Sequence, residues 1–147
     1  MEFTLNIVYG GELNASKALS PFVRNMRKII KDTFTSFENE AVTMFKVTLF
    51  FDGDISSYYN GTGIYQPRYY NVKKEYVVSF CIDRTQWTGN KEKDLNYFIF
   101  TITSLMIING DLILNKLAKY KYAFDINSYK HCVDICSKKM NDIVNEI

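Results

Sequence analysis

Hydrophobic side chains occupy every second position in three stretches of the chain, residues 3–9, 42–51 and 76–82. A period of two places these side chains on one face of a β-strand and the intervening side chains on the other. The sequence therefore predicts three strands, each with one buried face. Residues 55–73, which separate the second and third strands, are expected to form either a long loop or a loop with a short strand at 64–70. Pro67 would confine such a strand to the sheet edge.

Hydrophobic residues recur at the spacing of an α-helix in three further segments, residues 22–37, 95–106 and 129–147. Ser20 and Pro21 are typical of an N-cap and of the first helical position, so the first helix is expected to begin there. Asn90 is the expected N-cap of the second helix, and Asn127 or Ser128 that of the third. The sequence thus predicts about three amphipathic helices.

The Asn109–Gly110 pair leaves the middle of the second helical segment ambiguous. These residues either end the helix, with another helix at 111–119, or form a hairpin turn between 105–108 and 111–114. The helical alternative is preferred because the preceding spacing is that of a helix and not of a strand. The surrounding stretch 95–114 is apolar but interrupted by polar residues, which favours a buried core helix over a membrane span.

The order of these elements, β-α-β-(β)-β-α-(α)-α, is typical of an α+β fold. We expect a small, mostly antiparallel sheet of three or four strands with about three helices packed on one face. The connections between the later strands look too short for helical crossovers, which argues against a doubly wound parallel sheet. A chain of 147 residues without an internal repeat or a linker is expected to form one domain, residues 1–147.

The composition offers little for catalysis. The chain contains one histidine, His131, and neither a Gly-x-Ser-x-Gly sequence nor a glycine-rich phosphate loop that precedes a helix. Nucleophilic hydrolysis and phosphate-loop chemistry are therefore not expected. The Asp52-Gly53-Asp54 turn lacks the further ligands of a calcium loop. We expect no catalytic residue, no metal and no cofactor.

The three cysteines, Cys81, Cys132 and Cys136, are too few for a disulfide scaffold and odd in number. This usage is typical of a reduced, cytoplasmic protein, and the N-terminus lacks the basic and apolar regions of a signal peptide. Cys132 and Cys136 lie four residues apart beside His131, so two thiolates could face one metal ion. Both fall within the apolar stripe of the last helix, however, which favours buried core cysteines.

Two other functions are kept as alternatives. A small enzyme would use carboxylates at strand ends, drawn from Asp52, Asp54, Glu75 and Asp83. A nucleic-acid-binding module would use the basic face of the first helix, formed by Arg24, Arg27, Lys28 and Lys31. The formal net charge of +2 neither drives nor excludes nucleic-acid binding, and solvated helix faces commonly carry such charges, so this function is not favoured.

Five of the eleven tyrosines lie between residues 58 and 70, in a segment rich in Ser, Asn and Gly. Tyr and Arg are enriched at binding hot spots, and loops carry recognition more often than chemistry. We therefore expect a partner-binding surface made of Asp52, Asp54, Tyr58, Tyr59, Tyr65, Arg68, Tyr69, Tyr70 and Trp87. The alternative, that these rings fold inward and cover the sheet edge, stays open.

The segments Phe51–Asp54, Gly63–Tyr65 and Glu75–Asp83, together with Trp87, resemble bacterial immunity proteins of polymorphic-toxin and contact-dependent growth-inhibition systems. The resemblance implies a small, cytoplasmic, non-enzymatic α+β domain that inhibits a cognate toxin domain by binding it stoichiometrically, with no membrane involved. Immunity proteins against nucleases are often acidic, whereas this chain has a formal net charge of +2. An acidic face would have to be local, around Glu38, Glu40, Asp52 and Asp54.

Overall fold

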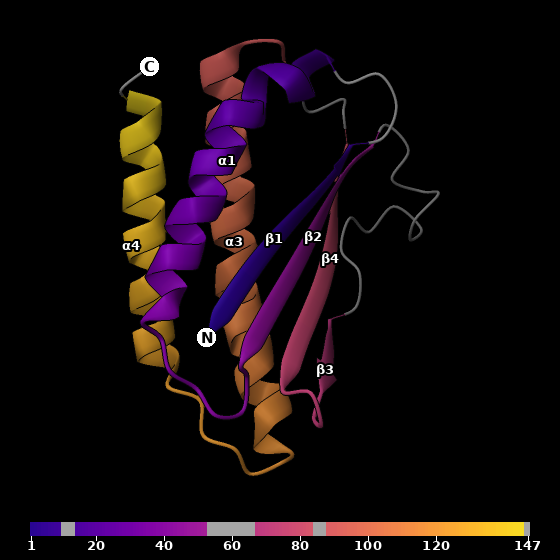
Figure 1. Ribbon diagram of the computed structural model, residues 1–147, viewed down its shortest axis with the longest axis vertical. Helices are drawn as coiled ribbons and strands as arrows, with labels where there is room; N and C mark the ends of the chain where they lie inside the picture. Colours follow the sequence, from indigo (N-terminus) through magenta and orange to yellow (C-terminus); the bar gives the residue numbers. More distant parts are fainter. Residues whose placement is uncertain (10–13, 53–66, 84–87, 146–147) are drawn as a thin grey trace.

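Three helices and four strands make up the part of the chain that the computed structural model describes, residues 1–9, 14–52, 67–83 and 88–145. In chain order they are β1 (Glu2–Tyr9), α1 (Asn14–Thr35), β2 (Met44–Asp52), β3 (Arg68–Tyr70), β4 (Glu75–Asp83), α3 (Lys91–Ala118) and α4 (Ile126–Asn145). Figure 1 shows the three helices on one side of the sheet. The α+β class expected from the sequence is confirmed.

The sheet is mixed, and most of its pairing is parallel. The strand order is β1-β2-β4-β3. β1 pairs with β2 and β2 with β4 in parallel, whereas the short β3 runs antiparallel to β4. The expectation of a mostly antiparallel sheet is therefore wrong. A parallel crossover needs a dozen or more residues but not necessarily a helix. Residues 53–74 between β2 and β4 are long enough for one, and α1 itself connects β1 to β2.

The alternating residues of the strands form the sheet side of the hydrophobic core, as predicted. Phe3, Phe45 and Tyr76 occupy one row across β1, β2 and β4 and are at most 2% exposed. The ring centroids of Phe3 and Phe45 are 4.6 Å apart, and those of Phe45 and Tyr76 are 5.2 Å apart. The next row consists of Leu5, Val47 and Val78.

A short edge strand is present at Arg68–Tyr70, within the range where it was expected. It follows Pro67, whose lack of an N–H donor is tolerated at a sheet edge. Residues 71–74 then turn the chain into β4, with Lys74 at a positive φ of 54°. Residues 64–66 of the expected strand lie outside the described residues.

α1 begins at Asn14, so the prediction of an N-cap at Ser20 is wrong, and Pro21 lies inside the helix. Proline has no N–H to donate, but its fixed φ is helical. A helix that has already begun therefore continues through it with one hydrogen bond missing. Beyond Pro21 the predicted apolar face is buried and includes Val23, Met26, Ile30 and Phe34.

α3 is one continuous helix of 28 residues, so Asn109–Gly110 neither ends it nor forms a hairpin turn. The buried side chain of Asn109 has both polar atoms hydrogen-bonded, which offsets the cost of burying an amide. Its Nδ2 donates to the carbonyl of Leu105 at 2.8 Å, and its Oδ1 accepts from the hydroxyl of Tyr76 at 2.7 Å. Gly110 leaves room for the ring of Tyr129, since a Cβ there would lie 2.4 Å from the Cε1 of that ring. Contacts with residues distant in the sequence thus explain why Asn109 and Gly110 occur in the middle of a continuous helix.

The N-terminus of α3 is capped as predicted, because the side chain of Asn90 accepts from the N–H of Lys93 at 3.1 Å. By length and composition alone α3 would suffice to cross a membrane. Half of its most apolar window is nevertheless buried inside the fold. That burial is what a core helix requires.

α4 carries the predicted apolar stripe, but Asp125 caps it and not Asn127 or Ser128. The carboxylate of Asp125 accepts from the hydroxyl of Ser128 at 2.6 Å and from its N–H at 3.1 Å, and these hydrogen bonds lower the pKa of Asp125. Neighbouring Asp, Asn and Ser all suit an N-cap, so residue preference alone did not separate them. The buried stripe consists of Tyr129, Cys132, Val133, Cys136, Met140 and Val144.

Replacing Gly110 with alanine is expected to destabilise the fold by about 1–3 kcal/mol, because the fully buried Tyr129 has no space to move away. Helix propensity alone would act in the opposite direction by about 1 kcal/mol, so the sign of the change reports the contact. Asn115→Ala, at an exposed position of the same helix, is the matched control and is expected to be neutral or slightly stabilising. Denaturant unfolding of both variants measures the difference. An unchanged or increased free energy of unfolding for Gly110→Ala contradicts this role.

Candidate partner-binding surface

Three of the nine residues predicted to bind a partner have described side chains, and all three form β3: Arg68, Tyr69 and Tyr70. Asp52 is the last residue of β2, but its side chain is not described. Five of the predictions lie outside the described residues, namely Asp54, Tyr58, Tyr59, Tyr65 and Trp87. The site is therefore built from β3 outward.

β3 divides its side chains between the two faces of the sheet. Tyr69 pairs with the fully buried Tyr76 and shares its helix-facing side, whereas Arg68 and Tyr70 are exposed on the opposite side. The hydroxyl of Tyr69 donates to the carbonyl of Ala41 at 2.6 Å. Each of the two interpretations left open by the sequence thus describes part of this segment. Tyr69 covers the sheet edge, while Arg68 and Tyr70 face solvent.

Two tyrosines from the connection between α3 and α4 extend this surface. The ring of Tyr120 meets that of Tyr69 edge-on, with centroids 5.5 Å apart. Tyr122 stacks against Tyr120 with a centroid distance of 6.1 Å and an interplanar angle of 19°. The sequence analysis missed both, because they lie about fifty residues after β3. The signal present in the sequence was the alternation Tyr120-Lys121-Tyr122 directly after the helix.

Lys74 joins the β3–β4 turn to these rings. Its Nζ donates to the hydroxyl of Tyr122 at 2.5 Å and to Oδ1 of Asn71 at 3.3 Å, and it lies 4.1 Å from the centroid of the Tyr122 ring. The hydroxyl of Tyr122 donates in turn to Asn71 at 3.2 Å. The hydrogen bond with Tyr122 raises the pKa of Lys74, so the lysine remains a cation at neutral pH. Lys74 is therefore a structural cation within this surface.

We call the exposed residues around these contacts the tyrosine–lysine platform. It consists of Val72 and Lys73 in the turn, Lys119, Tyr120 and Lys121 in the connection between α3 and α4, and Arg68 and Tyr70, whose side chains lie on the opposite side of β3 from Tyr69. Figure 1 places the β3–β4 turn and the connection between α3 and α4 at the same end of the molecule. Val72, in the turn, is 95% exposed. Among the described residues, no carboxylate lies within ion-pair distance of the platform's cations. The platform combines exposed rings, one apolar side chain and uncompensated positive charge.

Acidic residues lie beside the platform and not within it. Glu38 and Glu40 are exposed on the connection between α1 and β2 and line a shallow hollow next to Tyr122. The other two residues expected in a local acidic face, Asp52 and Asp54, have no described side chains. The described part of that face is thus limited to two glutamates.

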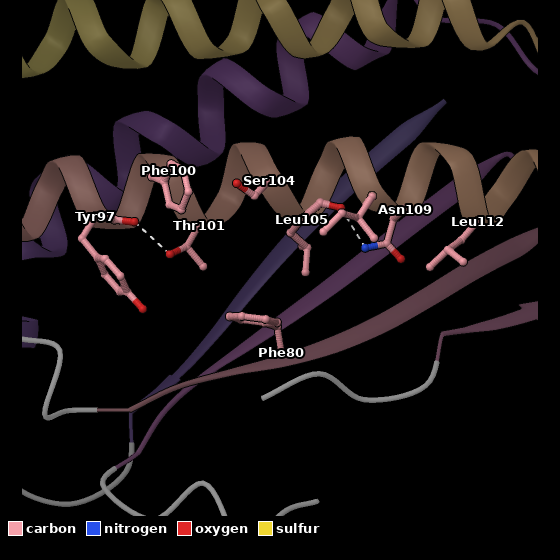
Figure 2. A pocket seen from close by; sticks show the side chains of 9 residues that line it. Phe80, Tyr97, Phe100, Thr101, Ser104, Leu105, Asn109 and Leu112 are labelled. Carbon is pink, nitrogen blue, oxygen red and sulfur yellow. Dashed lines mark hydrogen bonds between the residues drawn. The ribbon is translucent and has the colours of Figure 1, made fainter. Parts of the chain in front are cut away.

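An apolar pocket of about 240 Å³ lies between α3 and β4 (Figure 2). Its lining consists of Phe80, Tyr97, Phe100, Thr101, Ser104, Leu105, Ile108, Asn109 and Leu112. At its rim Phe100 is 68% and Ile108 49% exposed. The sequence carries no charged residue from Leu95 to Gly110. Apart from Tyr97, the lining has no titratable side chain, so the pocket offers shape and not acid–base chemistry.

Cys132 and Cys136 belong to the hydrophobic core. Both are buried and free, and burial raises the pKa of the Cys136 thiol to about 11. His131, the residue before Cys132, is exposed instead. Within the described ranges, no group of three or more His, Cys, Asp or Glu side chains is placed to hold a metal ion. The core interpretation of the two cysteines is confirmed by their burial.

Of the residues named for the alternative functions, the structure describes the side chains of Glu75 and of the four basic residues on α1. The carboxylate of Glu75 forms an ion pair with Lys46, with Nζ and Oε1 2.6 Å apart. The side chains of Asp52 and Asp83 are not described. The four basic residues predicted for a nucleic-acid-binding face of α1 are exposed: Arg24, Arg27, Lys28 and Lys31.

Both buried thiols are expected to resist a thiol-specific reagent at pH 8 while the protein is folded. The reacting form is the thiolate, and the raised pKa of each thiol adds to the protection that burial gives. A Cys81→Ser background leaves Cys132 and Cys136 as the only reporters, and protein unfolded in guanidinium serves as the control. Rapid modification of the folded protein, or protection that depends on added zinc, contradicts a core role.

A family model described as "Immunity protein 12" matches residues 1–133 of the chain. The matched range includes all four described strands, α1, α3 and the first turns of α4, and therefore the whole tyrosine–lysine platform. Neither the curated proteins nor the solved structures contain a match to the chain.

Proposed function

The chain belongs to the Immunity protein 12 family, in agreement with its resemblance to bacterial immunity proteins, and from this premise we propose that it neutralises a cognate toxin domain by binding it directly. The family supports a toxin-neutralising role. Stoichiometric binding, a polymorphic-toxin or contact-dependent growth-inhibition system as its setting, and action in the bacterial cytoplasm are our proposals. The two buried free thiols suit a reducing compartment.

The observation that carries this proposal is the group of exposed aromatic residues at one end of the fold, of which Tyr120 is packed between Tyr69 and Tyr122. Tyr70 and Tyr120 are 44% and 45% exposed, and Arg68 lies beside Tyr70 on β3. Tyr and Arg supply large contact areas and directional hydrogen bonds, which is why they dominate binding hot spots. A surface of this composition supports recognition of another protein.

The structural roles of three described titratable groups also support binding over catalysis. Glu75 is paired with Lys46, Lys74 joins a turn to Tyr122, and Asp125 caps α4. Each of these groups is occupied by a structural contact. General acid–base catalysis instead needs titratable groups that reach a substrate inside a pocket. A non-enzymatic inhibitor is therefore the proposed mode of action.

Co-expression with the toxin domain encoded immediately upstream of this chain is expected to restore bacterial growth. The same toxin domain, purified, is expected to form a one-to-one complex with the chain in size-exclusion chromatography with light scattering. An unrelated toxin domain serves as the specificity control. Continued toxicity despite equal expression, or the absence of a complex with the purified toxin domain, contradicts direct neutralisation.

A further inference from the structure

We propose that the tyrosine–lysine platform is the toxin-contact surface of this chain and that it binds an acidic surface of the toxin domain, an inference that rests on the function proposed above. Residues of β3, the β3–β4 turn and the connection between α3 and α4 form the platform. Three properties support this assignment. The ring of Tyr120 is ordered before binding, the positive charges are uncompensated within the described residues, and the apolar side chain of Val72 is exposed in the turn.

The aromatic part of the platform is held in place by contacts within the protein. Tyr120 lies between Tyr69, edge-on at 5.5 Å, and Tyr122, nearly parallel at 6.1 Å. Tyr69 is fixed in turn by its hydrogen bond to Ala41. Tyr120 nevertheless keeps 45% of its surface exposed. A ring ordered in this way loses little conformational freedom when a partner binds, so its contact area contributes efficiently to affinity.

The positive charge of the platform favours a partner whose contact surface is negatively charged. Among the described residues, ion pairs form only between Lys46 and Glu75, at 2.6 Å, and between Lys130 and Asp111, at 3.7 Å, so the exposed cations of α1 are unpaired there as well. Within the described part of the chain, the platform's cations, Arg68, Lys73, Lys119 and Lys121, have no carboxylate at ion-pair distance. Uncompensated positive charge on a binding surface accelerates encounter with an acidic partner and disfavours basic ones. The complementary surface of the toxin domain is therefore acidic.

The exposed turn favours a folded protein over a nucleic acid as the partner. Lys74 adopts a positive φ of 54° and is held by Tyr122 and Asn71, which fixes the turn that carries Val72. Val72 is 95% exposed. Contacts with phosphate and sugar groups are polar, so an exposed valine adds little binding free energy to a nucleic-acid complex. A hydrophobic depression on a protein can bury the same side chain. We therefore place Val72 at the centre of the contact, with lysines around it.

The charge of the platform is opposite to that of an inhibitor that imitates nucleic acid. Such an inhibitor presents anions to the cationic groove of a nuclease. In this chain Glu38 and Glu40 lie beside the platform, whereas Arg68 lies on the same side of β3 as Tyr70, and Lys119 and Lys121 flank Tyr120 in the sequence. Inhibition would then occur at an acidic surface of the toxin domain.

Charge reversal on the platform tests the proposal, with the toxin domain encoded upstream as the binding partner. The platform variant carries Lys73→Glu, Lys119→Glu and Lys121→Glu. The matched control carries Arg24→Glu, Lys28→Glu and Lys31→Glu on the exposed face of α1, so both variants change the net charge equally. We expect the platform variant to raise the dissociation constant by on the order of 100-fold, mainly through slower association, and the control to change it by less than about threefold.

A second variant, Val72→Asp, is expected to weaken binding by at least about tenfold without altering thermal unfolding, because the side chain is almost fully exposed. Thermal unfolding of all variants confirms that they fold. If the wild-type chain binds the toxin domain and both platform variants bind equally well, the platform assignment is overturned while the proposed function stands. If the wild-type chain does not bind the toxin domain, the proposed function itself fails. Platform-dependent binding to a 20-base-pair DNA or RNA duplex, with toxin binding unchanged, identifies a nucleic-acid surface and overturns the proposal.

Discussion

The ring of Tyr129 holds the helical layer together, and the position of the candidate surface depends on it. It occupies the space left by Gly110 on α3, and its hydroxyl donates to the carbonyl of Met106 at 2.6 Å. Its ring also lies within 6.0 Å, between centroids, of Phe34, Phe37 and Phe124. One fully buried side chain of α4 thereby contacts α1, α3 and the connection between α3 and α4. Because this contact fixes α3 against α4, it also fixes the start and the end of the connection that carries Tyr120 and Tyr122.

Local pattern and distant contacts contribute differently to this fold. The alternation of residues 3–9 and 76–82 and the helical spacing of 129–144 depend on burial of one face, so the sequence alone predicted these elements and the α+β class. Parallel pairing of β2 with β4 is a contact between segments distant in the sequence, and a pattern of apolar positions does not encode the direction of such pairing. The continuity of α3 through Asn109–Gly110 depends on Tyr76 and Tyr129, and no local rule applied at that pair includes either residue.

The same distinction applies to the candidate surface. Arg68 and Tyr70 were predicted because Tyr and Arg are enriched at binding hot spots and both lie in a segment rich in Ser, Asn and Gly, and the structure places both on the exposed side of β3. Tyr120 and Tyr122 were missed because only the fold brings the end of α3 next to β3 and the turn after it. Tyr69 was predicted as a contact residue, but its hydroxyl also donates to the carbonyl of Ala41 and so holds the sheet edge in place. Membership in the Immunity protein 12 family supports the function, while the choice of surface is argued from the structure.

Hydrogen–deuterium exchange of the chain, free and in complex with its toxin domain, tests the proposed contact most directly because it reports on every backbone segment at once. The account predicts slower exchange in the complex at residues 68–74 and 117–122, with no change at residues 24–31 of α1. Unchanged exchange in both platform segments of a fully formed complex would contradict it.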